Sequence, residues 1–231
     1  MFHGSGRDRY ALNEVSFWSG GLNAGTINEK GDKSFNREHG PEATDDMFGG
    51  YQPVGDLIFD FGGPVAEGTF RREIRLDEGC VSACGQRNGS LVQSQAFCSY
   101  TDQVMVLNYH CSSSSGLTGK IVFATQRETD VVMVEGNVLR LECQIANGIK
   151  CIAQATVRHH GGTLKEGDRH LSLEGADSCA ILLAIETNYE MDFSKGFRGE
   201  SAESRISRRM SQVETLSFDE LKNRHSEDYS A

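Results

Sequence analysis

The segment LNEVSFWSGG, residues 12–21, holds the only tryptophan of the chain, Trp18, close to Asn13 and Glu14. An indole ring can stack on a sugar ring, and the neighbouring amide and carboxylate can hydrogen-bond to its hydroxyl groups. Alternatively, Trp18 packs in a core or against a neighbouring domain, and Asn13 and Glu14 pair with loop backbone groups, since buried polar groups need partners. Both interpretations stay open, with packing favoured.

Other residue patterns do not form a recognisable catalytic or metal-binding motif. His159 and His160 are adjacent at an expected strand end, where neighbouring side chains point to opposite faces and cannot readily share one metal ion. The run Ser112–Ser115 lacks the GxSxG context of a nucleophile elbow. With 33 carboxylates in the chain, spacing alone cannot select an acid–base pair. We expect neither a metal nor a cofactor.

The cysteines are odd in number and irregularly spaced, and no CxxC motif occurs. Most of them lie in apolar, strand-like runs, where a free thiol behaves as a small hydrophobic side chain. We therefore predict buried, reduced thiols, ahead of a disulfide framework and of a metal site. The seven residues are Cys80, Cys84, Cys98, Cys111, Cys143, Cys151 and Cys179.

Composition and charge exclude several classes of protein. The chain has 231 residues, 38% of them hydrophobic and 24% charged, as in a soluble globular protein. Its formal net charge of −10 argues against nucleic acid and anionic membranes as partners. No apolar run approaches the roughly 18–20 residues that span a bilayer. The N-terminus has no apolar segment typical of a signal peptide, so localisation stays open.

From Tyr51 onward, hydrophobic and polar residues alternate with a period of two, which is typical of antiparallel strands with one buried face. Residues 56–61, DLIFDF, show this alternation. Residues 70–77, FRREIRLD, repeat it and predict that Phe70, Ile74 and Leu76 face the core. The run Cys179–Ile185 is apolar at nearly every position, which indicates a strand covered on both faces. Roughly ten such strands predict a β-sandwich.

The last part of the chain changes to a helical period. Ile206, Met210 and Val213 are spaced as on one face of an amphipathic helix, and Ser217 with Glu220 has the spacing of a capping box. We therefore expect a mainly β domain over residues 1–195, of which 1–50 are mostly loop, followed by the start of a helical linker over residues 196–231.

Several segments resemble, in order, motifs of glycoside hydrolase family 95, the inverting α-L-fucosidases and their relatives. LNEVSFWSGG is similar to the family's LNE–xx–LWSGG signature, and GGYQPVGDLIFDF to its YQPLGDL strand. The resemblance continues through FRREIRLDEGCVSACG, QAFCSYTDQVMVL, LEGADSCAILLAIETNY and HSEDYSA. It extends from about Phe2 to Ala231.

The resemblance implies the N-terminal antiparallel β-supersandwich of such an enzyme, with a C-terminal helical linker segment. In the family, the catalytic groups belong to a following (α/α) toroid. No residue of this chain corresponds to them, so we expect no catalytic residue and no activity of the chain alone. The implied partners are that catalytic domain and a fucosylated glycan. Relatives are commonly exported.

The same resemblance extends the interpretation of the tryptophan segment. Its loop would reach the catalytic pocket, and the expected substrate-binding residues are Asn13, Glu14, Trp18, Tyr51 and Gln52. Two departures are large, because the family's opening strand does not precede Phe2 and an Asn/Gly-rich segment, residues 22–50, replaces a helical insertion. The alternatives are a free-standing carbohydrate-binding sandwich and a non-functional gene fragment.

Overall fold

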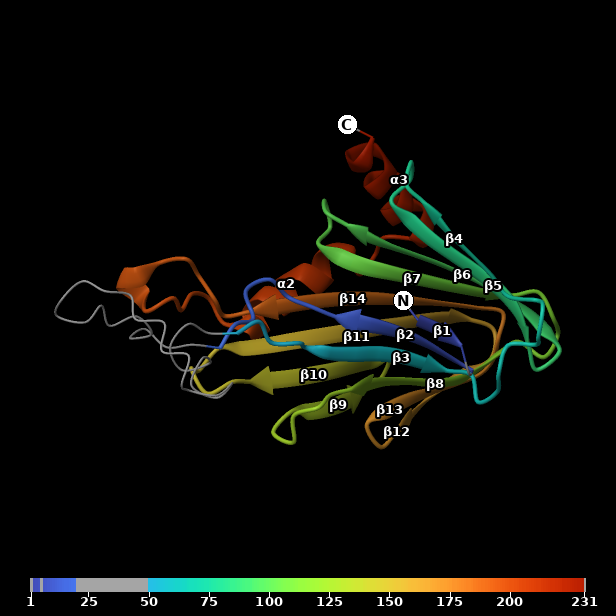
Figure 1. Ribbon diagram of the computed structural model, residues 1–231, viewed down its shortest axis with the longest axis horizontal. Coiled ribbons are helices and arrows are strands. Elements are labelled where there is room, and N and C mark those ends of the chain that lie inside the picture. The colour runs from blue at the N-terminus through green and yellow to red at the C-terminus, as the bar shows by residue number, and fades with distance from the viewer. Residues whose placement is uncertain (1, 5, 20–49, 231) are drawn as a thin grey trace, which may run out of the picture.

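A computed structural model of the protein, which describes residues 2–4, 6–19 and 50–230, shows two antiparallel β-sheets packed against each other (Figure 1). One sheet has six strands, in the order β1 (Phe2–Gly4), β2 (Arg7–Leu12), β3 (Gly55–Asp60), β8 (Leu117–Ala124), β13 (His170–Ala176) and β12 (Thr163–Gly167). The other has eight: β4 (Arg71–Arg75), β5 (Cys80–Arg87), β6 (Ser90–Ser99), β7 (Val104–Cys111), β14 (Ser178–Thr187), β11 (Lys150–His160), β10 (Val138–Gln144) and β9 (Val131–Glu135). The predicted antiparallel β-sandwich is confirmed.

The main hydrophobic core lies between the two sheets and follows the alternation seen in the sequence. On β3, Leu57 and Phe59 are fully buried, and Phe61 continues the same face. They pack with residues of the facing sheet such as Leu107 and Tyr109. Each fully buried side chain of this size contributes about 1.5–3 kcal/mol relative to an exposed one. The sandwich is therefore held together mainly by this core.

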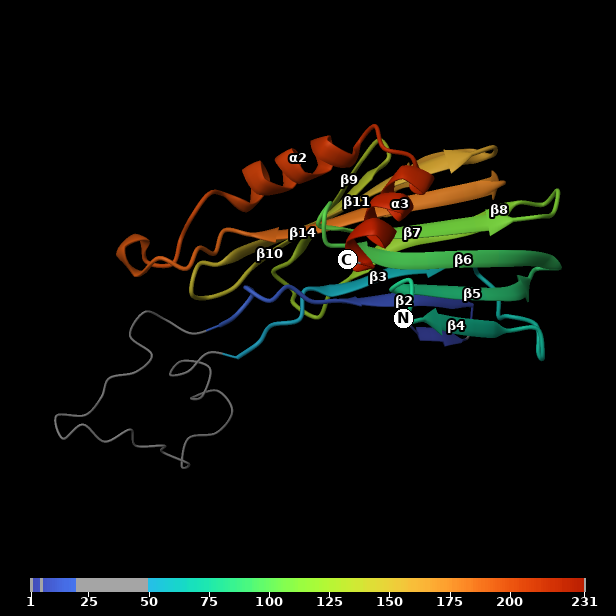
Figure 2. The same cartoon turned by 90° about the horizontal axis from the view of Figure 1, so that it is seen from above.

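A second core lies on the outer face of the eight-stranded sheet, under two helices, α2 (Ala202–Val213) and α3 (Phe218–Tyr229) (Figure 2). Ile206 and Val213 of α2 and Leu221 of α3 are fully buried there. Because α2 packs on β14, residues Ile181–Ala184 are buried on both faces of the sheet, as the apolar run predicts. None of the described helices has the length and apolar character needed to cross a bilayer.

The caps of the two helices fix where they begin and end. The Ser217 hydroxyl accepts from the Glu220 backbone N–H while the Glu220 carboxylate accepts from the Ser217 backbone N–H, which confirms the predicted capping box. At the other end of α2, Arg158 of β11 donates from Nη1 to the Leu216 carbonyl (2.6 Å) and from Nη2 to the Val213 carbonyl (2.9 Å). The last carbonyls of a helix have no partner within it. The Val213 carbonyl also accepts from the Leu216 N–H (3.1 Å), and Arg158 fastens this end of the helix to the sheet.

We expect Arg158→Met to lower the free energy of unfolding by about 2 kcal/mol, because the carbonyls at the end of α2 lose charge-assisted hydrogen bonds. Arg158→Lys should recover only part of this free energy, since an ammonium group cannot reproduce the planar arrangement of guanidinium donors. Urea unfolding followed by circular dichroism measures both. The matched control is Arg208→Met on the exposed side of α2, where Arg208 makes only a solvent-exposed ion pair with Glu200. Equal losses for the two methionine variants would contradict the role of Arg158.

The prediction that Phe70, Ile74 and Leu76 face the core is wrong, and Phe70 is 43% exposed. Strand β4 is the edge strand of its sheet, and all five of its residues are exposed. Ile74 is 59% exposed and Leu76, just after the strand, is 79% exposed. The alternation of FRREIRLD is real, but neither core reaches this edge. The period of a strand shows which side chains share a face, and not whether anything covers that face.

Within residues 1–50, which the sequence predicts to be mostly loop, the structure describes two strands, β1 and β2. On β2, buried and exposed residues alternate, with Tyr10 and Leu12 in the core. The alternation was missed because a charged residue, Asp8, occupies the first buried position of that face. The rest of the expected loop, residues 20–49, lies outside the described residues.

Candidate functional site

The predicted site residues lie at one end of the sandwich, where the chain leaves β2 and enters β3. Residues 13–19 and 50–54 run side by side there, since the Ser19 N–H donates to the Gly50 carbonyl (2.9 Å) and the Gln52 N–H donates to the Phe17 carbonyl (3.0 Å). Trp18 and Tyr51 form the antiparallel bridge between them. We call this region, with residues 145–149 and 187–199, the Trp18 end.

Trp18 does not pack in the sandwich core. Its side chain is 47% exposed, and its ring meets that of Tyr51 edge to face, with 5.6 Å between centroids. Its Nε1 donates to the Val15 carbonyl (2.7 Å). The preceding residue, Phe17, occupies the core position and is fully buried, with the Arg127 guanidinium 5.2 Å from its ring centroid. Residues on either side of a strand-like backbone point in opposite directions, so burial of Phe17 turns Trp18 outward.

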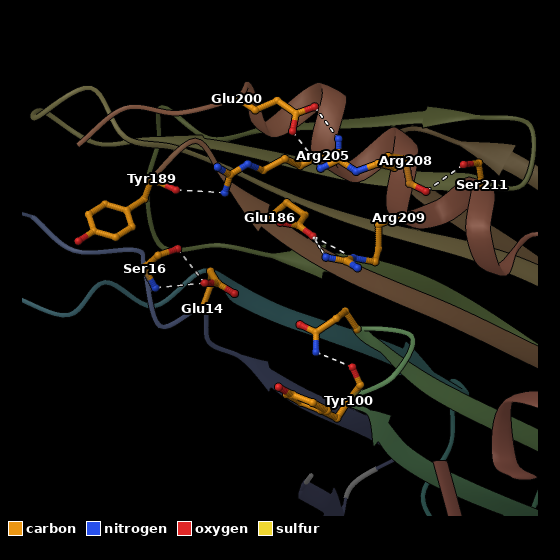
Figure 3. Close-up of polar contacts among 11 residues, drawn as sticks. Glu14, Ser16, Tyr100, Glu186, Tyr189, Glu200, Arg205, Arg208, Arg209 and Ser211 are labelled. Carbon is orange, nitrogen blue, oxygen red and sulfur yellow. Dashed lines mark hydrogen bonds and ion pairs between the residues drawn. The ribbon is translucent and has the colours of Figure 1, made fainter. Parts of the chain in front are cut away.

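Glu14 is half-buried beside these rings. Its Oε1 accepts from the Ser16 backbone N–H (3.1 Å) and from the Ser16 hydroxyl (2.8 Å), as Figure 3 shows. The Ser16 hydroxyl also lies 2.5 Å from that of Thr187 at the end of β14, which ties the loop to the sheet. Burial and the nearby charge of Glu14 raise the pKa of Tyr51, while its hydrogen bond to the Glu14 backbone opposes the rise. A carboxylate thus lies next to exposed aromatic surface.

The other two predicted residues are placed differently. The Gln52 side chain is half-buried and donates to the Ser19 hydroxyl and to the Gly50 carbonyl, both at 3.3 Å, so it braces the loop. Asn13 is exposed at the end of β2. The structure therefore brings Glu14, Trp18, Tyr51 and Gln52 together. Their contact with a substrate stays a prediction.

Sequence reasoning missed a second group of residues at this end. Asn147, in the β10–β11 turn, donates from Nδ2 to the Trp18 carbonyl (2.8 Å), and its own carbonyl accepts from Arg198. Arg198 belongs to the segment between β14 and α2, which contains the short 3-10 helix η1 (Phe193–Lys195). In this segment Met191 and Phe193 are highly exposed. The aromatic-rich sequence NYEMDFSKGF was a usable signal, although only the fold shows that it neighbours Trp18.

Charged groups around the segment are held by local ion pairs. Arg209 of α2 binds Glu186 at the end of β14 (2.9 Å), and Lys195 binds Glu190 (2.7 Å). Arg205 donates to the Tyr189 carbonyl (3.1 Å) (Figure 3). These ion pairs and the Arg205 hydrogen bond hold the segment between β14 and α2 in place at the Trp18 end.

The thiols do not add a nucleophile to this end. The prediction that most cysteines are buried is confirmed, and the exceptions are Cys98, which is exposed, and Cys84, which is half-buried. Cys143 and Cys179 lie in the core, where burial raises the pKa of each thiol to about 12 and so suppresses the reactive thiolate. Among the described residues, no three His, Cys, Asp or Glu side chains are grouped so that they could hold a metal ion.

Comparison with known proteins gives the chain a family context. Residues 1–192 match the family model described as glycosyl hydrolase family 65, N-terminal domain. The chain is 28% identical over 197 residues to "Probable alpha-fucosidase A" of Aspergillus niger, a match that covers 79% of this chain and 24% of that protein. It is 24% identical over 213 residues to "Alpha-L-fucosidase 2" of Arabidopsis thaliana, covering 78% and 25%. This chain therefore spans about a quarter of the length of these relatives.

A solved structure named "Putative kojibiose phosphorylase from human microbiome" has a TM-score of 0.46 and 9% sequence identity, and the match covers 75% of this chain and 28% of that chain.

Proposed function

The chain belongs to the glycosyl hydrolase family 65 N-terminal domain family, and from this premise we propose that it is the N-terminal β-sandwich of an α-L-fucosidase-type glycoside hydrolase of the family 95 kind. The full-length enzyme would hydrolyse O-glycosyl bonds with inversion, through a catalytic (α/α) toroid. The names of the two relatives and the order of the family 95 motifs support the fucosidase assignment. In this proposal the sandwich supports the catalytic domain and lines part of its active site.

The observation that carries the proposal is the exposed apolar surface of the Trp18 end. Trp18, Tyr51, Met191 and Phe193 are large hydrophobic side chains exposed on segments that hydrogen bonds hold together. Grouped exposure of such side chains marks a surface that contacts another domain or a ligand. Glu14 adds a carboxylate beside the rings, and polar groups next to an apolar stacking face are one combination that binds a sugar ring.

A chimera tests the proposal. This chain replaces the aligned quarter of the Aspergillus relative, and hydrolysis of an aryl α-L-fucoside is measured. We expect the chain alone to be inactive and the chimera to be active. Trp18→Ala and Glu14→Gln in the chimera should each lower kcat/KM at least tenfold, because contacts to the substrate are lost.

The matched control is Phe70→Ala, since Phe70 is 43% exposed, close to the value for Trp18, but lies just before the edge strand β4. It should leave kcat/KM unchanged. Size-exclusion chromatography and circular dichroism establish that each chimera is folded. A folded chimera with undiminished kcat/KM in both Trp18→Ala and Glu14→Gln would contradict a role of the Trp18 end in the active site. Fucosidase activity that copurifies with the isolated chain would contradict the proposal that the chain supports a separate catalytic domain.

A further inference from the structure

The outer face of the eight-stranded sheet is divided into apolar and polar rows. Each row consists of residues that lie directly opposite one another on successive strands. The row through Phe97, Val106 and Leu182 is apolar and belongs to the second core, under the helices. Two neighbouring rows contain amide, hydroxyl and imidazole groups and together form what we call the amide face. Its members on β5, β6, β7 and β14 are Cys84, Gln93, His110 and Ser178 in one row, and Ser82, Gln95, Asn108 and Ala180 in the other.

The amide face is not covered by a described helix. In Figure 2, α2 and α3 lie over the part of the sheet toward the end of β14, and the opposite ends of β5, β6, β7 and β14 are open. The Trp18 end is at the end of β14, next to Thr187, whereas Ser178 is the first residue of that strand. At about 3.4 Å per residue, the two regions are about 30 Å apart. The amide face is thus separate from the candidate site.

The polar side chains of the amide face have no protein partners. Within the described part of the chain, the side chains of Gln93, Gln95, Asn108 and His110 make no hydrogen bond to another residue, and neither do those of Ser82 and Ser178. Amides and imidazoles can both donate and accept hydrogen bonds. These side chains can therefore hydrogen-bond to solvent or to a ligand, because the fold does not use their donors and acceptors.

The amide face is also uncharged. None of its eight positions is Asp, Glu, Lys or Arg, although the chain is 24% charged and carries a net charge of −10. A soluble protein surface as a whole is typically designed with roughly 25–35% charged residues. Charges stand at its borders, where Arg71 and Glu73 of β4 pair with each other and Arg158 of β11 binds the end of α2. A hollow at the β4 border is lined by Arg71, Glu73, Ser82, Cys84 and Gln93, among others.

We propose that the amide face binds a neutral oligosaccharide laid across the strands. A polyhydroxylated chain is the ligand whose donors and acceptors match a row of uncharged amides and hydroxyls without requiring a charged partner. From β5 to β14 the rows of the amide face cross three strand spacings of about 4.8 Å, about 14 Å in total, which is long enough for a few sugar rings. Anionic polymers are disfavoured by the net charge of the chain. This inference goes beyond the proposed function, because it concerns a separate face and needs no catalytic domain.

Protection of Cys84 from alkylation tests the proposal in the 231-residue chain. Cys84 lies in the amide face and Cys98, which is exposed outside it, serves as an internal control. The probes are cellohexaose, mannohexaose and xylohexaose, with the corresponding disaccharides and an anionic hexagalacturonate for comparison. We expect at least one neutral hexasaccharide to slow the reaction of Cys84 with iodoacetamide at least threefold, without changing Cys98. The disaccharides and the hexagalacturonate should protect less.

Variants locate the binding. Gln95→Ala with Asn108→Ala should raise the dissociation constant of the protecting hexasaccharide at least tenfold, measured by NMR titration, because two hydrogen-bonding groups are removed from the centre of the face. Gln144→Ala, an exposed glutamine at the end of β10, is the matched control and should bind like the unaltered chain. Urea unfolding checks that stability is unchanged. The proposal is overturned if no neutral hexasaccharide protects Cys84 at its solubility limit, or if the double variant binds as tightly as the control.

Discussion

Replacing Asp8 by asparagine is expected to lower the free energy of unfolding by about 3–5 kcal/mol, because it leaves a buried guanidinium without its carboxylate. Asp8 on β2 and Arg87 on β5 belong to the two different sheets, and their side chains are 3% and 5% exposed. Arg87 Nη2 donates to Asp8 Oδ1 at 2.7 Å. The guanidinium also lies over the Phe61 ring, 4.4 Å from its centroid.

The size of the effect follows from the cost of an unpaired charge in the core. In water the guanidinium is solvated, whereas between the sheets the carboxylate compensates for the lost water. Arg87 Nη1 is already buried without a hydrogen-bond partner among the described residues, so the surroundings offer little replacement. An asparagine can accept one hydrogen bond but cannot neutralise the charge. The variant must therefore either keep an unpaired cation or open the sandwich locally.

A double variant separates this effect from lost packing. Asp8→Leu with Arg87→Met removes both charges and keeps comparable volume, and it should be much more stable than Asp8→Asn and close to the unaltered chain. Urea unfolding of the three proteins, with equal slopes, gives the comparison. If Asp8→Asn cost less than about 1 kcal/mol, as an exposed ion pair does, then the pair would have to be solvated and the description of the core at this place would be wrong.

The sequence allowed the prediction of those features that depend on neighbouring residues. Alternation in DLIFDF placed Leu57 and Phe59 in the core, and the apolar run Cys179–Ile185 indicated a strand covered on both faces. The capping box of Ser217 and Glu220 was also visible, because its two members are three residues apart. All of these patterns are local, so they can be recognised in the sequence without knowledge of the fold.

Features that depend on distant residues could not be predicted from one sequence. Asp8 and Arg87 are 79 residues apart, and nothing in either segment shows that they pair. The exposure of Ile74 depends on the position of β4 at the edge of the sheet, which is set by strand order. Likewise, the amide face exists only because the registers of four strands align their polar residues. Cross-strand register is a property of the whole sheet.

The candidate site could be predicted from the sequence only in part. A family motif drew attention to Glu14, Trp18, Tyr51 and Gln52, and the structure brings them together through the bridge between Trp18 and Tyr51. The same motif could not show that Asn147 and the segment of residues 187–199 lie beside them, since these contacts join three separate loops. It also could not decide which of two adjacent aromatic residues is buried.

That choice gives the second large prediction, which concerns Phe17 and Trp18. Phe17→Ala should lower the free energy of unfolding by about 3–5 kcal/mol, because it removes a fully buried ring and leaves a cavity between the sheets. Trp18→Ala should cost only about 1–2 kcal/mol, since it removes a half-exposed ring, one edge-to-face contact and one hydrogen bond to the Val15 carbonyl. Urea unfolding followed by circular dichroism compares the two variants without relying on the lost indole.

Fluorescence of the unaltered chain provides the control, because Trp18 is its single tryptophan. Acrylamide should quench the native emission nearly as efficiently as that of the urea-unfolded chain, as befits an indole in contact with water. A loss of stability in Trp18→Ala as large as that in Phe17→Ala, or native emission shielded from acrylamide, would place the tryptophan in the core. The expected difference has a functional consequence. An aromatic ring that contributes little to folding is free to make its main contacts with another domain or a sugar, whereas Phe17 holds the loop that presents it.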